Sequence, residues 1–463
     1  MVLRRAKILA TLGPASSDET VIQALQAAGA DAFRVNASHM SPAEVAAQVR
    51  LIRLAAPNAA VLVDIQGPKL RLGVLTEARS VGPGEVVEFS HLDSVTSGVV
   101  PLGFDPFEVG LESGHRVIFA DGRVEALVVE AVHPLISIQF PSGGVLESRK
   151  GVNLPDTLVR LPVIGEADLR TIEAGLEAGC DWFALSFVQT AADMLELREL
   201  VGDKARLMAK IERPQAVANL ESIARVSDAV LVARGDLGVE FPFEQVPMVQ
   251  REVWECCTAM GVPVVCATEM LESMTVSSRP TRAEATDVAQ AVFDTFDAVM
   301  LSAETAVGHD PVGAVSAMSR IRAQVELSDR FTQRLGRQSA YQARDPRTSA
   351  VAAAAEQLAR SVEAVAIIAL TSSGVTAGTL SACRPSVPVI AVTASRSVAR
   401  QLNMLWGVTA LMSEKSSTVE LAATTACRAA AEAGLIQSGD LVVVCGSRIG
   451  PLADADAIWV QHA

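Results

Sequence analysis

Residues 206–212 have the sequence R-L-M-A-K-I-E, a short apolar run that ends in Lys210 and Glu212. The same plan, an apolar run that finishes in polar residues and precedes a stretch with helical spacing, recurs through residues 1–330. The runs occupy residues 7–13, 32–38, 60–67, 182–188, 206–212, 229–236, 262–269 and 296–304. Parallel strands are buried on both faces and therefore appear as near-continuous hydrophobic runs. The pattern predicts an α/β fold, a closed TIM (β/α)8 barrel whose chemistry lies at the C-terminal ends of its strands.

Local signals between these runs mark where helices begin and end. Ser16, Ser41 and Thr281 each precede a glutamate by three residues, the spacing of a capping box. In that motif the hydroxyl and the carboxylate bind the free amides of the first turn. Gly29 and Gly179 stand where a helix would stop before the next strand. We therefore expect helices to begin and end at these points.

The interval between the third and fourth runs is too long for one helix, and its pattern of apolar and polar residues is different. It contains short β-like pieces, such as residues 84–89 and 116–120, separated by Gly and Pro. We expect an inserted all-β, barrel-like domain at 73–159 that could close as a lid over the catalytic end of the barrel. The barrel domain then comprises 1–72 and 160–330.

The remaining residues, 331–463, show a second alternation of helices and strands. Helices are expected at roughly 348–360, 397–407 and 417–434, and strands at 363–370, 387–394 and 439–446. This alternation predicts a C-terminal open α/β domain.

The composition excludes some classes of partner. The net charge of −14 argues against broad binding of nucleic acid or anionic membranes, which needs a basic face. No apolar run of the sequence approaches the length of a membrane span. The seven cysteines include no C-x-x-C pair and several lie in apolar runs. We expect buried, reduced thiols in a cytoplasmic protein that binds neither nucleic acid nor membranes.

Polar side chains stand at the C-terminal ends of most predicted barrel strands. In chain order they are Arg34, Asn36, Ser38, Asp64, Lys69, Arg71, Lys210, Glu212, Asp236, Thr268, Glu269, Ser302 and Glu304. Lys210 and Glu212 are two residues apart on one strand, so they face the same side of the sheet. Carboxylates on neighbouring strands suit Mg²⁺, and the cations beside them suit a phosphoryl group. This spacing alone also fits Mg²⁺-dependent aldolases and lyases that act on pyruvate-like substrates.

Longer phrases distinguish between these enzyme classes. They are K-I-L-A-T-L-G-P-A-S (7–16), R-V-N-A-S-H (34–39), A-K-I-E-R-P (209–214), V-A-R-G-D-L-G-V-E (232–240), A-T-E-M-L-E-S-M (267–274), R-P-T-R-A-E (279–284) and D-A-V-M-L-S-A-E-T-A (297–306). In these phrases and their order the sequence resembles the pyruvate kinase family over nearly its whole length. The insert resembles the family weakly, mainly through K-G-V-N-L-P (150–155), and the C-terminal domain does so moderately.

The resemblance implies an activity and its partners. It implies transfer of phosphate from phosphoenolpyruvate to ADP, which gives pyruvate and ATP in the last step of glycolysis. It also implies Mg²⁺ or Mn²⁺ as cofactor and a homotetrameric assembly. Two rival hypotheses remain, a lyase that processes pyruvate or oxaloacetate and a degenerate kinase that serves as a metabolite sensor. A coupled assay with phosphoenolpyruvate, ADP and Mg²⁺ separates the three.

The resemblance further implies roles for single residues. Arg34 would bind the phosphate of phosphoenolpyruvate, Lys210 would stabilise the phosphoryl group in flight, and Glu212 and Asp236 would hold the metal. The remaining roles fall into three groups: contact with the substrate carboxylate by Gly235, Asp236 and Thr268, protonation of the enolate through a water relay from Thr268 or Ser302, and contact with the nucleotide by Arg71 and Lys150.

Departures from the family pattern bear on the cations. A monovalent-cation site is formally present in Asn36, Ser38, Asp64 and the carbonyl of Ile65. Lys69, however, stands where K⁺-dependent members carry Glu, which implies that K⁺ is not required because a tethered ammonium supplies the charge. Glu269 stands where Gln is usual and adds a negative charge near the metal.

A further loop in the C-terminal domain resembles a regulatory site. Its residues Thr371, Ser372, Ser373, Gly374 and Thr376 link a predicted strand to a helix, so amides and hydroxyls could hold a phosphate. The family often binds a sugar-phosphate effector at the corresponding loop. The alternative is an ordinary helix N-cap.

Overall fold

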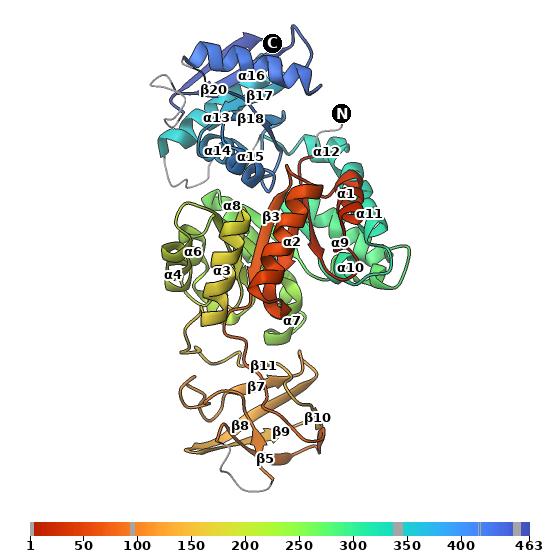
Figure 1. Cartoon of the computed structure of the whole chain (residues 1–463), viewed down its shortest axis with the longest axis vertical. Coiled ribbons are helices and arrows are strands. Elements are labelled where there is room, and N and C mark those ends of the chain that lie inside the picture. Colours follow the sequence, from red (N-terminus) through yellow and green to blue (C-terminus); the bar gives the residue numbers. More distant parts are fainter. Residues whose placement is uncertain (1–3, 93–97, 337–345, 415, 417, 448–454) are drawn as a thin grey trace.

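The computed structural model describes residues 4–92, 98–336, 346–414, 416, 418–447 and 455–463. Three parts lie in line along its longest axis (Figure 1). A β-rich part stands at one end, a barrel surrounded by helices occupies the middle, and an α/β part stands at the other end.

The middle part is a closed parallel barrel, as predicted. Its strands are β1 (Lys7–Leu12), β2 (Ala32–Asn36), β3 (Ala60–Ile65), β12 (Trp182–Leu185), β13 (Arg206–Ile211), β14 (Ala229–Ala233), β15 (Val264–Ala267) and β16 (Ala298–Leu301). Each strand pairs with its neighbours in parallel, and β1 closes the barrel by pairing with both β2 and β16. Almost every strand residue is buried, which explains the uninterrupted apolar runs.

Helices surround the barrel and two of the three predicted capping boxes are confirmed. The helices are α1 (Glu19–Ala28), η1 (Ala37–His39), α2 (Pro42–Ala55), α3 (Glu166–Ala178), α4 (Ala191–Val201), α5 (Pro214–Ala218), α6 (Leu220–Val226), α7 (Arg234–Glu240), α8 (Val246–Met260), η2 (Glu272–Thr275), α9 (Arg282–Phe293), α10 (Ala303–Ala306), α11 (Pro311–Glu326) and α12 (Asp329–Thr332). Ser41 and Thr281 form complete capping boxes. The prediction for Ser16 was wrong, because Asp18 caps α1 and Ser16 accepts the amide of Gly13 instead. Gly29 and Gly179 end α1 and α3 as expected.

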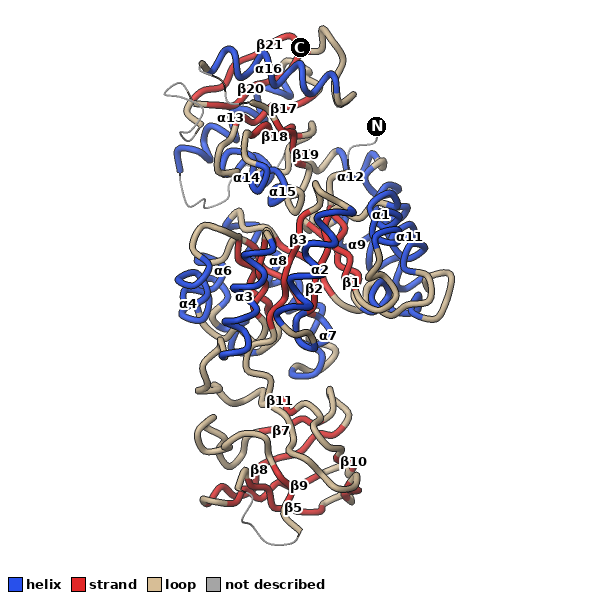
Figure 2. Tube along the Cα trace, viewed as in Figure 1, coloured by secondary structure: helices blue, strands red, loops and turns tan. Residues whose placement is uncertain are grey.

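The predicted insert lies between β3 and β12. In its described residues, 73–92 and 98–159, Figure 2 shows strands and loops. The strands are β4 (Arg79–Val81), β5 (Glu85–Ser90), β6 (Val100–Pro101), β7 (Arg116–Phe119), β8 (Val124–Val132), β9 (Leu135–Phe140), β10 (Gly144–Leu146) and β11 (Val152–Asn153). They form a six-stranded sheet, order β11-β7-β8-β9-β5-β6, and a pair, β10-β4. The exact domain boundaries near residues 72, 160 and 330 stay predictions.

Two adjacent segments connect the insert to the barrel. The amide of Leu72 donates to the carbonyl of Lys150 at 2.8 Å, and the amide of Val152 donates to the carbonyl of Leu70 at 3.0 Å. The outgoing and returning chain therefore form a short antiparallel neck. The return linker, which we define as residues 154–159, follows it towards the barrel.

The C-terminal part is an open α/β sheet, as predicted, with more elements than expected. It comprises α13 (Pro346–Ser361), β17 (Ala366–Leu370), α14 (Val375–Ala382), β18 (Val389–Thr393), α15 (Arg396–Leu402), β19 (Val408–Met412), α16 (Val419–Glu432), β20 (Leu441–Gly446) and β21 (Ala457–His462). The strand order is β19-β18-β17-β20-β21, and only β21 among these is antiparallel to its neighbour. The sequence did not predict β19 or β21, and α15 ends five residues earlier than expected. Residue 417 of the helix predicted at 417–434 lies outside the described residues.

The C-terminal part contacts the barrel at the N-terminal ends of the strands. Arg384 forms an ion pair with Asp297, which precedes β16, at 2.6 Å. Asp181, which precedes β12, accepts Arg400 at 2.8 Å and also pairs with Arg53. The C-terminal ends of the strands therefore remain free to face the insert. No helix in the described ranges is long and apolar enough to cross a membrane.

Candidate active site

Three charged side chains, from strands β2, β3 and β13, meet inside the C-terminal end of the barrel. Asp64, at the end of β3, accepts Arg34 Nε at 2.8 Å and lies 3.3 Å from Lys210 Nζ. Arg34 comes from β2, which pairs with β3, and it also donates to Thr11 Oγ1 at 3.2 Å. Burial raises the pKa of Asp64, but Lys210 and Arg34 outweigh burial and hold it below its ordinary value. Asp64 is therefore a buried anion held between two cations.

Lys210 is the most densely paired cation of the site. Its Nζ lies 2.7 Å from Glu212 Oε1 and donates to Ser186 Oγ at 2.7 Å. Burial lowers the pKa of Lys210, but the charges of Asp64 and Glu212 outweigh burial and raise it above its ordinary value. The ammonium consequently stays charged at neutral pH and can meet an incoming anion.

Glu212 shares the buried site and interacts with a second carboxylate. Its Oε2 accepts the amide of Phe187 at 2.8 Å. Burial raises the pKa of Glu212 above its usual range against the opposing charge of Lys210, and the negative charge of Asp236 adds to the rise. A cation near both carboxylates would relieve this repulsion.

The donor set suits a hard divalent cation. Among the described residues, no three His, Cys, Asp or Glu side chains converge as a closed metal site. Mg²⁺ is commonly held by one or two carboxylates and completes its shell with water and substrate oxygens. Glu212 and Asp236 therefore fit such an ion without a third protein carboxylate.

The start of α7 and the end of β15 are joined by unusual backbone geometry. Thr268 has φ of +65°, a conformation that is sterically unfavourable for a β-branched residue. Its Oγ1 accepts the amide of Gly235 at 2.8 Å, and its carbonyl accepts Arg234 Nη2 at 2.7 Å. Residues in such regions cost about 1–3 kcal/mol each and cluster at functional sites. These contacts hold Thr268 beside Gly235 and Asp236.

Ser302 lies at the end of β16 with a free hydroxyl. Its Oγ is buried and has no hydrogen-bond partner within the described part of the chain. Its amide donates to Glu304 Oε2 at 2.6 Å, and Glu304 Oε1 accepts the amide of Leu271 at 2.9 Å. The buried Glu304 thus fixes the ends of β15 and β16 next to each other.

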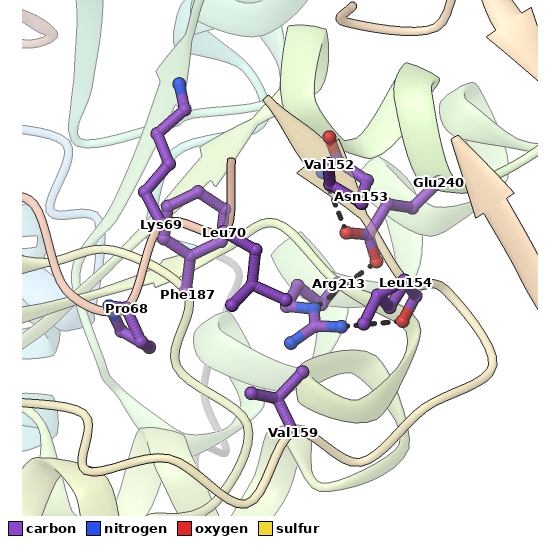
Figure 3. A pocket seen from close by; sticks show the side chains of 10 residues that line it. All are labelled: Pro68, Lys69, Leu70, Val152, Asn153, Leu154, Val159, Phe187, Arg213 and Glu240. Carbon is purple, nitrogen blue, oxygen red and sulfur yellow. Dashed lines mark hydrogen bonds and ion pairs between the residues drawn. The ribbon is translucent and has the colours of Figure 1, made fainter. Parts of the chain in front are cut away.

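The residues of the formal K⁺ site lie at or just after the ends of β2 and β3, and they differ in how far they are buried. Asp64 and Ile65 are buried at the end of β3, and Asp64 is the register partner of Asn36 on β2. Asn36 Oδ1 accepts the amide of Ser38 at 3.3 Å. Lys69 is exposed, and Figure 3 shows its side chain directed away from Arg213 and Glu240.

The expected nucleotide and effector residues lie outside this buried cluster. Arg71 and Lys150 belong to the neck, where Arg71 Nη1 donates to the carbonyl of Arg149 at 3.2 Å and Lys150 pairs with Glu147 at 3.5 Å. Residues 371–376 join β17 to α14 in the C-terminal part, and Thr371 Oγ1 accepts the amide of Gly374 at 2.9 Å. The N-cap of α14 is Gly374 with φ of +88°, and Ser373 Oγ accepts the amide of Val375, the first residue of α14, at 3.4 Å.

Two members of the cluster were missed from the sequence. Ser186 follows β12 and bridges Lys210 to Asp64, whose Oδ1 accepts its hydroxyl at 3.2 Å. The polar position at the strand end, the signal used on the other strands, would have found it. Arg213, buried next to Glu212, was also missed because nothing local distinguishes it from a surface arginine.

Comparisons with known proteins place this chain among its relatives. The family described as pyruvate kinase, barrel domain, matches residues 3–315, and the pyruvate kinase alpha/beta domain matches residues 349–459. A pyruvate kinase of Agrobacterium vitis is 43% identical over 449 residues, which cover 95% of this chain and 93% of the relative. A pyruvate kinase of Methylorubrum extorquens is 42% identical over 95% of this chain and 93% of its own. The crystal structure of a pyruvate kinase from Cryptosporidium parvum superimposes with a TM-score of 0.92 at 32% identity, over 99% of this chain and 96% of that one.

Proposed function

This chain belongs to the pyruvate kinase family and has its enzymatic activity, and from that premise we propose that Arg34, Lys210 and Glu212 form its phosphoryl-transfer centre. The observation that carries the proposal is the buried Lys210 ammonium, 2.7 Å from Glu212 and 3.3 Å from Asp64 at the end of the barrel. The substrates that the family implies are phosphoenolpyruvate and ADP, with pyruvate and ATP as products.

The electrostatics of the cluster suit phosphoryl transfer. The transferred group carries negative charge on its equatorial oxygens, so fixed cations around it lower the barrier. Arg34 is oriented by Asp64 and Thr11, which leaves part of its guanidinium for the substrate phosphate. Lys210 stays protonated and is aimed by Ser186 and Asp64. Neither cation has to reorganise when the phosphate enters.

The divalent metal that the family uses fits Glu212 and Asp236, and we propose Mg²⁺ or Mn²⁺ as that ion. When bound, the ion would neutralise charge on substrate oxygens. The exposed Glu269 lies beside Gly235 in the lining of a cleft next to α7, where its charge could alter metal preference.

The donors around α7 suit the carboxylate of the substrate. The amide end of a helix favours anions, and Gly235 and Asp236 occupy the first turn of α7. We assign the substrate carboxylate to Gly235, Asp236 and Thr268. The unpartnered Ser302 hydroxyl and Thr268 are the groups assigned to relay a proton to the enolate.

Substitution Lys210→Met tests the phosphoryl-transfer centre. A cation that acts on the phosphoryl group in flight contributes mainly to the transition state, so kcat should fall while KM changes less. The loss should be on the order of 10²–10³-fold. A folded K210M variant with near wild-type kcat in a coupled pyruvate assay would remove Lys210 from the centre.

The nucleotide is assigned to Arg71 and Lys150, and the insert is assigned the part of a closing lid. Both residues lie in the neck that connects the insert to the barrel, and both are partly exposed. Substitution Arg71→Met should raise KM for ADP several-fold and leave KM for phosphoenolpyruvate nearly unchanged, because a rim contact to one substrate adds about 1 kcal/mol or more of binding. Equal changes in both constants would contradict the assignment.

Lys69 is proposed to replace a bound K⁺ near Asn36, Ser38, Asp64 and the Ile65 carbonyl. The proposal rests on the family resemblance and on the exposed position of Lys69 beside Gly151 of the neck. Activity should persist in buffer free of K⁺ and Na⁺ and balanced with tetramethylammonium. Substitution Lys69→Glu should weaken catalysis and make it respond to KCl. Strong KCl activation of the wild type would overturn the proposal.

The loop at 371–376 is proposed to bind a phosphorylated effector, such as a sugar phosphate. Thr371 and Ser372 line a cleft together with Thr393, Ser395 and Ser413, which offers several hydroxyl donors. Sugar phosphates that shift phosphoenolpyruvate saturation should lose their effect in Ser373→Asp because of the added negative charge. Activation that survives this substitution places the effector elsewhere.

We propose a cytoplasmic homotetramer as the working form. The tetramer rests on the family resemblance alone, and light scattering during gel filtration tests it. The location rests on the cysteines, all seven of which are free thiols. Burial raises the pKa of Cys266 to about 11 and that of Cys445 to about 12, so these thiols are unreactive and suit a reducing compartment.

A further inference from the structure

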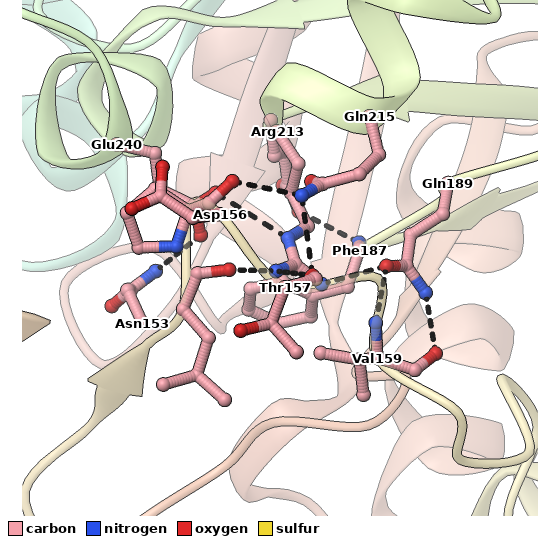
Figure 4. A network of polar contacts seen from close by, with 12 residues as sticks. Asn153, Asp156, Thr157, Val159, Phe187, Gln189, Arg213, Gln215 and Glu240 are labelled. Atoms are coloured by element: carbon pink, nitrogen blue, oxygen red, sulfur yellow. Dashed lines mark hydrogen bonds and ion pairs between the residues drawn. The ribbon is translucent and has the colours of Figure 1, made fainter. Parts of the chain in front are cut away.

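Arg213 is a buried cation that none of the roles above uses. Its side chain is 4% exposed and directly follows Glu212 in the chain. Figure 4 shows its guanidinium at the centre of a polar network between the insert and the barrel. Nη2 donates to the carbonyl of Leu154 at 2.7 Å and to that of Thr157 at 3.4 Å, and Nη1 donates to Gln189 Oε1 at 3.2 Å. Two of these acceptors are main-chain atoms of the return linker.

The partners of Arg213 belong to segments that build the active site. Gln189 follows Phe187, whose amide holds Glu212. Glu240, which pairs with Arg213 Nε at 3.4 Å, ends α7, the helix whose first turn contains Gly235 and Asp236. One guanidinium thus joins the loop after β12, the end of α7 and the return linker.

Further bonds fix the return linker on both of its sides. On the barrel side, Gln215 Nε2 donates to the carbonyl of Pro155 at 2.8 Å, and Gln189 exchanges two bonds with Val159 at 2.9 and 3.0 Å. On the insert side, Asp156 accepts Arg116 at 2.8 and 3.0 Å. The linker is therefore a joint that is pinned to the barrel by one set of side chains and to the insert by another.

Charge explains why an arginine occupies this position. Glu240 is 1% exposed and also accepts Asn153 Nδ2, from β11 of the insert, at 3.0 Å. A buried carboxylate without a cation is strongly unfavourable. Lysine could supply that cation but not the fork of donors that reaches Glu240, Gln189 and Leu154 together. The main-chain acceptors of the linker require the guanidinium itself.

We propose that Arg213 is a positioning residue that fixes the insert relative to the barrel and so sets where Arg71 and Lys150 meet the nucleotide opposite Glu212 and Asp236. The inference rests on the proposed nucleotide contacts of the neck. Arg213 touches no substrate in this scheme. It acts through the return linker, so its effect should fall on the substrate that binds between insert and barrel.

Three variants separate positioning from stability. Arg213→Lys keeps a cation for Glu240 and loses the fork. Arg213→Met combined with Glu240→Met leaves no unpaired charge, and such replacements of buried pairs are often neutral or stabilising. Arg322→Met is the matched control, because Arg322 is also buried, at 2% exposed, and bonds Asp31 and the carbonyl of Ala6 far from the insert.

The expected result is a selective defect with ADP. In R213K and in the double variant, kcat/KM for ADP should fall roughly tenfold, the effect of about one charged hydrogen bond, while kcat/KM for phosphoenolpyruvate falls much less. Hydrogen exchange at the Val159 amide should accelerate in both. R322M should lower the melting temperature and leave the ratio of the two constants unchanged.

Three other outcomes would overturn the positioning role of Arg213. They differ in whether the proposed nucleotide contacts of Arg71 and Lys150 survive. Wild-type values of kcat/KM for ADP in the double variant would show that Arg213 only neutralises Glu240. An ADP defect in R71M without one in R213K would remove the positioning role and keep the nucleotide contacts. Unchanged ADP kinetics in R71M and R213K alike would remove both.

Discussion

At the scale of single residues, Asp64 links the two cations that we propose bind the phosphate. It lies between Arg34 and Lys210, and its replacement leaves two buried cations facing each other. Asp64→Asn should therefore destabilise the barrel by about 3–5 kcal/mol, the usual effect of removing one partner from a buried ion pair. Phosphate affinity should also fall because Arg34 loses its orienting partner. Urea unfolding of D64N against wild type measures the first effect, and a loss under 1 kcal/mol would contradict it.

Asp64 should also make the stability of the folded protein depend on pH in the acid range. The pKa of Asp64 is lowered in the folded state, so its contribution is complete above the ordinary aspartate pKa of about 3.9 and is lost as pH falls through the folded value. The difference in melting temperature between wild type and D64N should stay constant from pH 7 to about 5 and shrink below about pH 4. A difference that grows on acidification would have the wrong sign for this assignment.

The sequence identified these residues but did not predict which of them form ion pairs with one another. Arg34, Asp64 and Lys210 were all identified from their places at strand ends. Spacing along the chain could not show that Asp64 serves both cations, because this depends on rotamers and on which strands are neighbours. Lys69 illustrates the converse, since its motif is clear in the sequence while its side chain is exposed and directed away from Arg213 and Glu240 (Figure 3).

At the scale of secondary-structure elements, two capping boxes offer a matched comparison. Glu44 bonds only Ser41 among the described residues, whereas Glu284 bonds Thr281 and also the amide and hydroxyl of Ser273 at 2.7 and 2.5 Å. Glu284→Ala should therefore cost about 2–4 kcal/mol and Glu44→Ala about 1 kcal/mol. Urea midpoints of the two variants test this, and equal shifts would mean that the bonds to Ser273 contribute nothing.

Elements with strong periodic or capping signals were predicted, and those defined by tertiary pairing were not. The eight barrel strands are apolar on both faces and stood out. The edge strand β21 is only partly buried and exists through its pairing with β20, and its apolar run, 457–460, is only four residues long. The error at Ser16 is similar in kind, because Asp18 competes for the same helix terminus and Ser16 folds back onto Gly13.

At the scale of the whole molecule, buried ion pairs attach the C-terminal part to the barrel. Arg384 and Asp297 are 5% and 1% exposed and bond at 2.6 Å. Arg384→Met leaves Asp297 buried without its partner and should weaken the attachment by about 3–5 kcal/mol. Calorimetry should then show the C-terminal part unfolding in a separate, earlier transition. Arg225→Met, which removes an exposed helix pair with Glu221, is the control and should cost under about 0.5 kcal/mol.

The three-part architecture was predictable because the alternation of strands and helices gives way to short β-like pieces between residues 73 and 159. The barrel pattern resumes after them. The way in which the parts meet was not. Arg384, Arg400 and Arg213 carry the contacts between parts, and each looks like a surface arginine until the fold brings a buried carboxylate to it.

The antiparallel neck offers a way to ask whether the insert keeps water from the reaction. Because Leu72 and Lys150 are hydrogen-bonded neighbours, a two-residue turn could replace the insert and leave the path from β3 to β12 unbroken. Such a truncated chain would keep Arg34, Lys210 and Glu212 but would open the phosphoryl group to solvent. We expect it to release inorganic phosphate from phosphoenolpyruvate in place of making ATP. If the insert closes over the barrel as proposed, this experiment measures how much it favours transfer to a nucleotide over transfer to water.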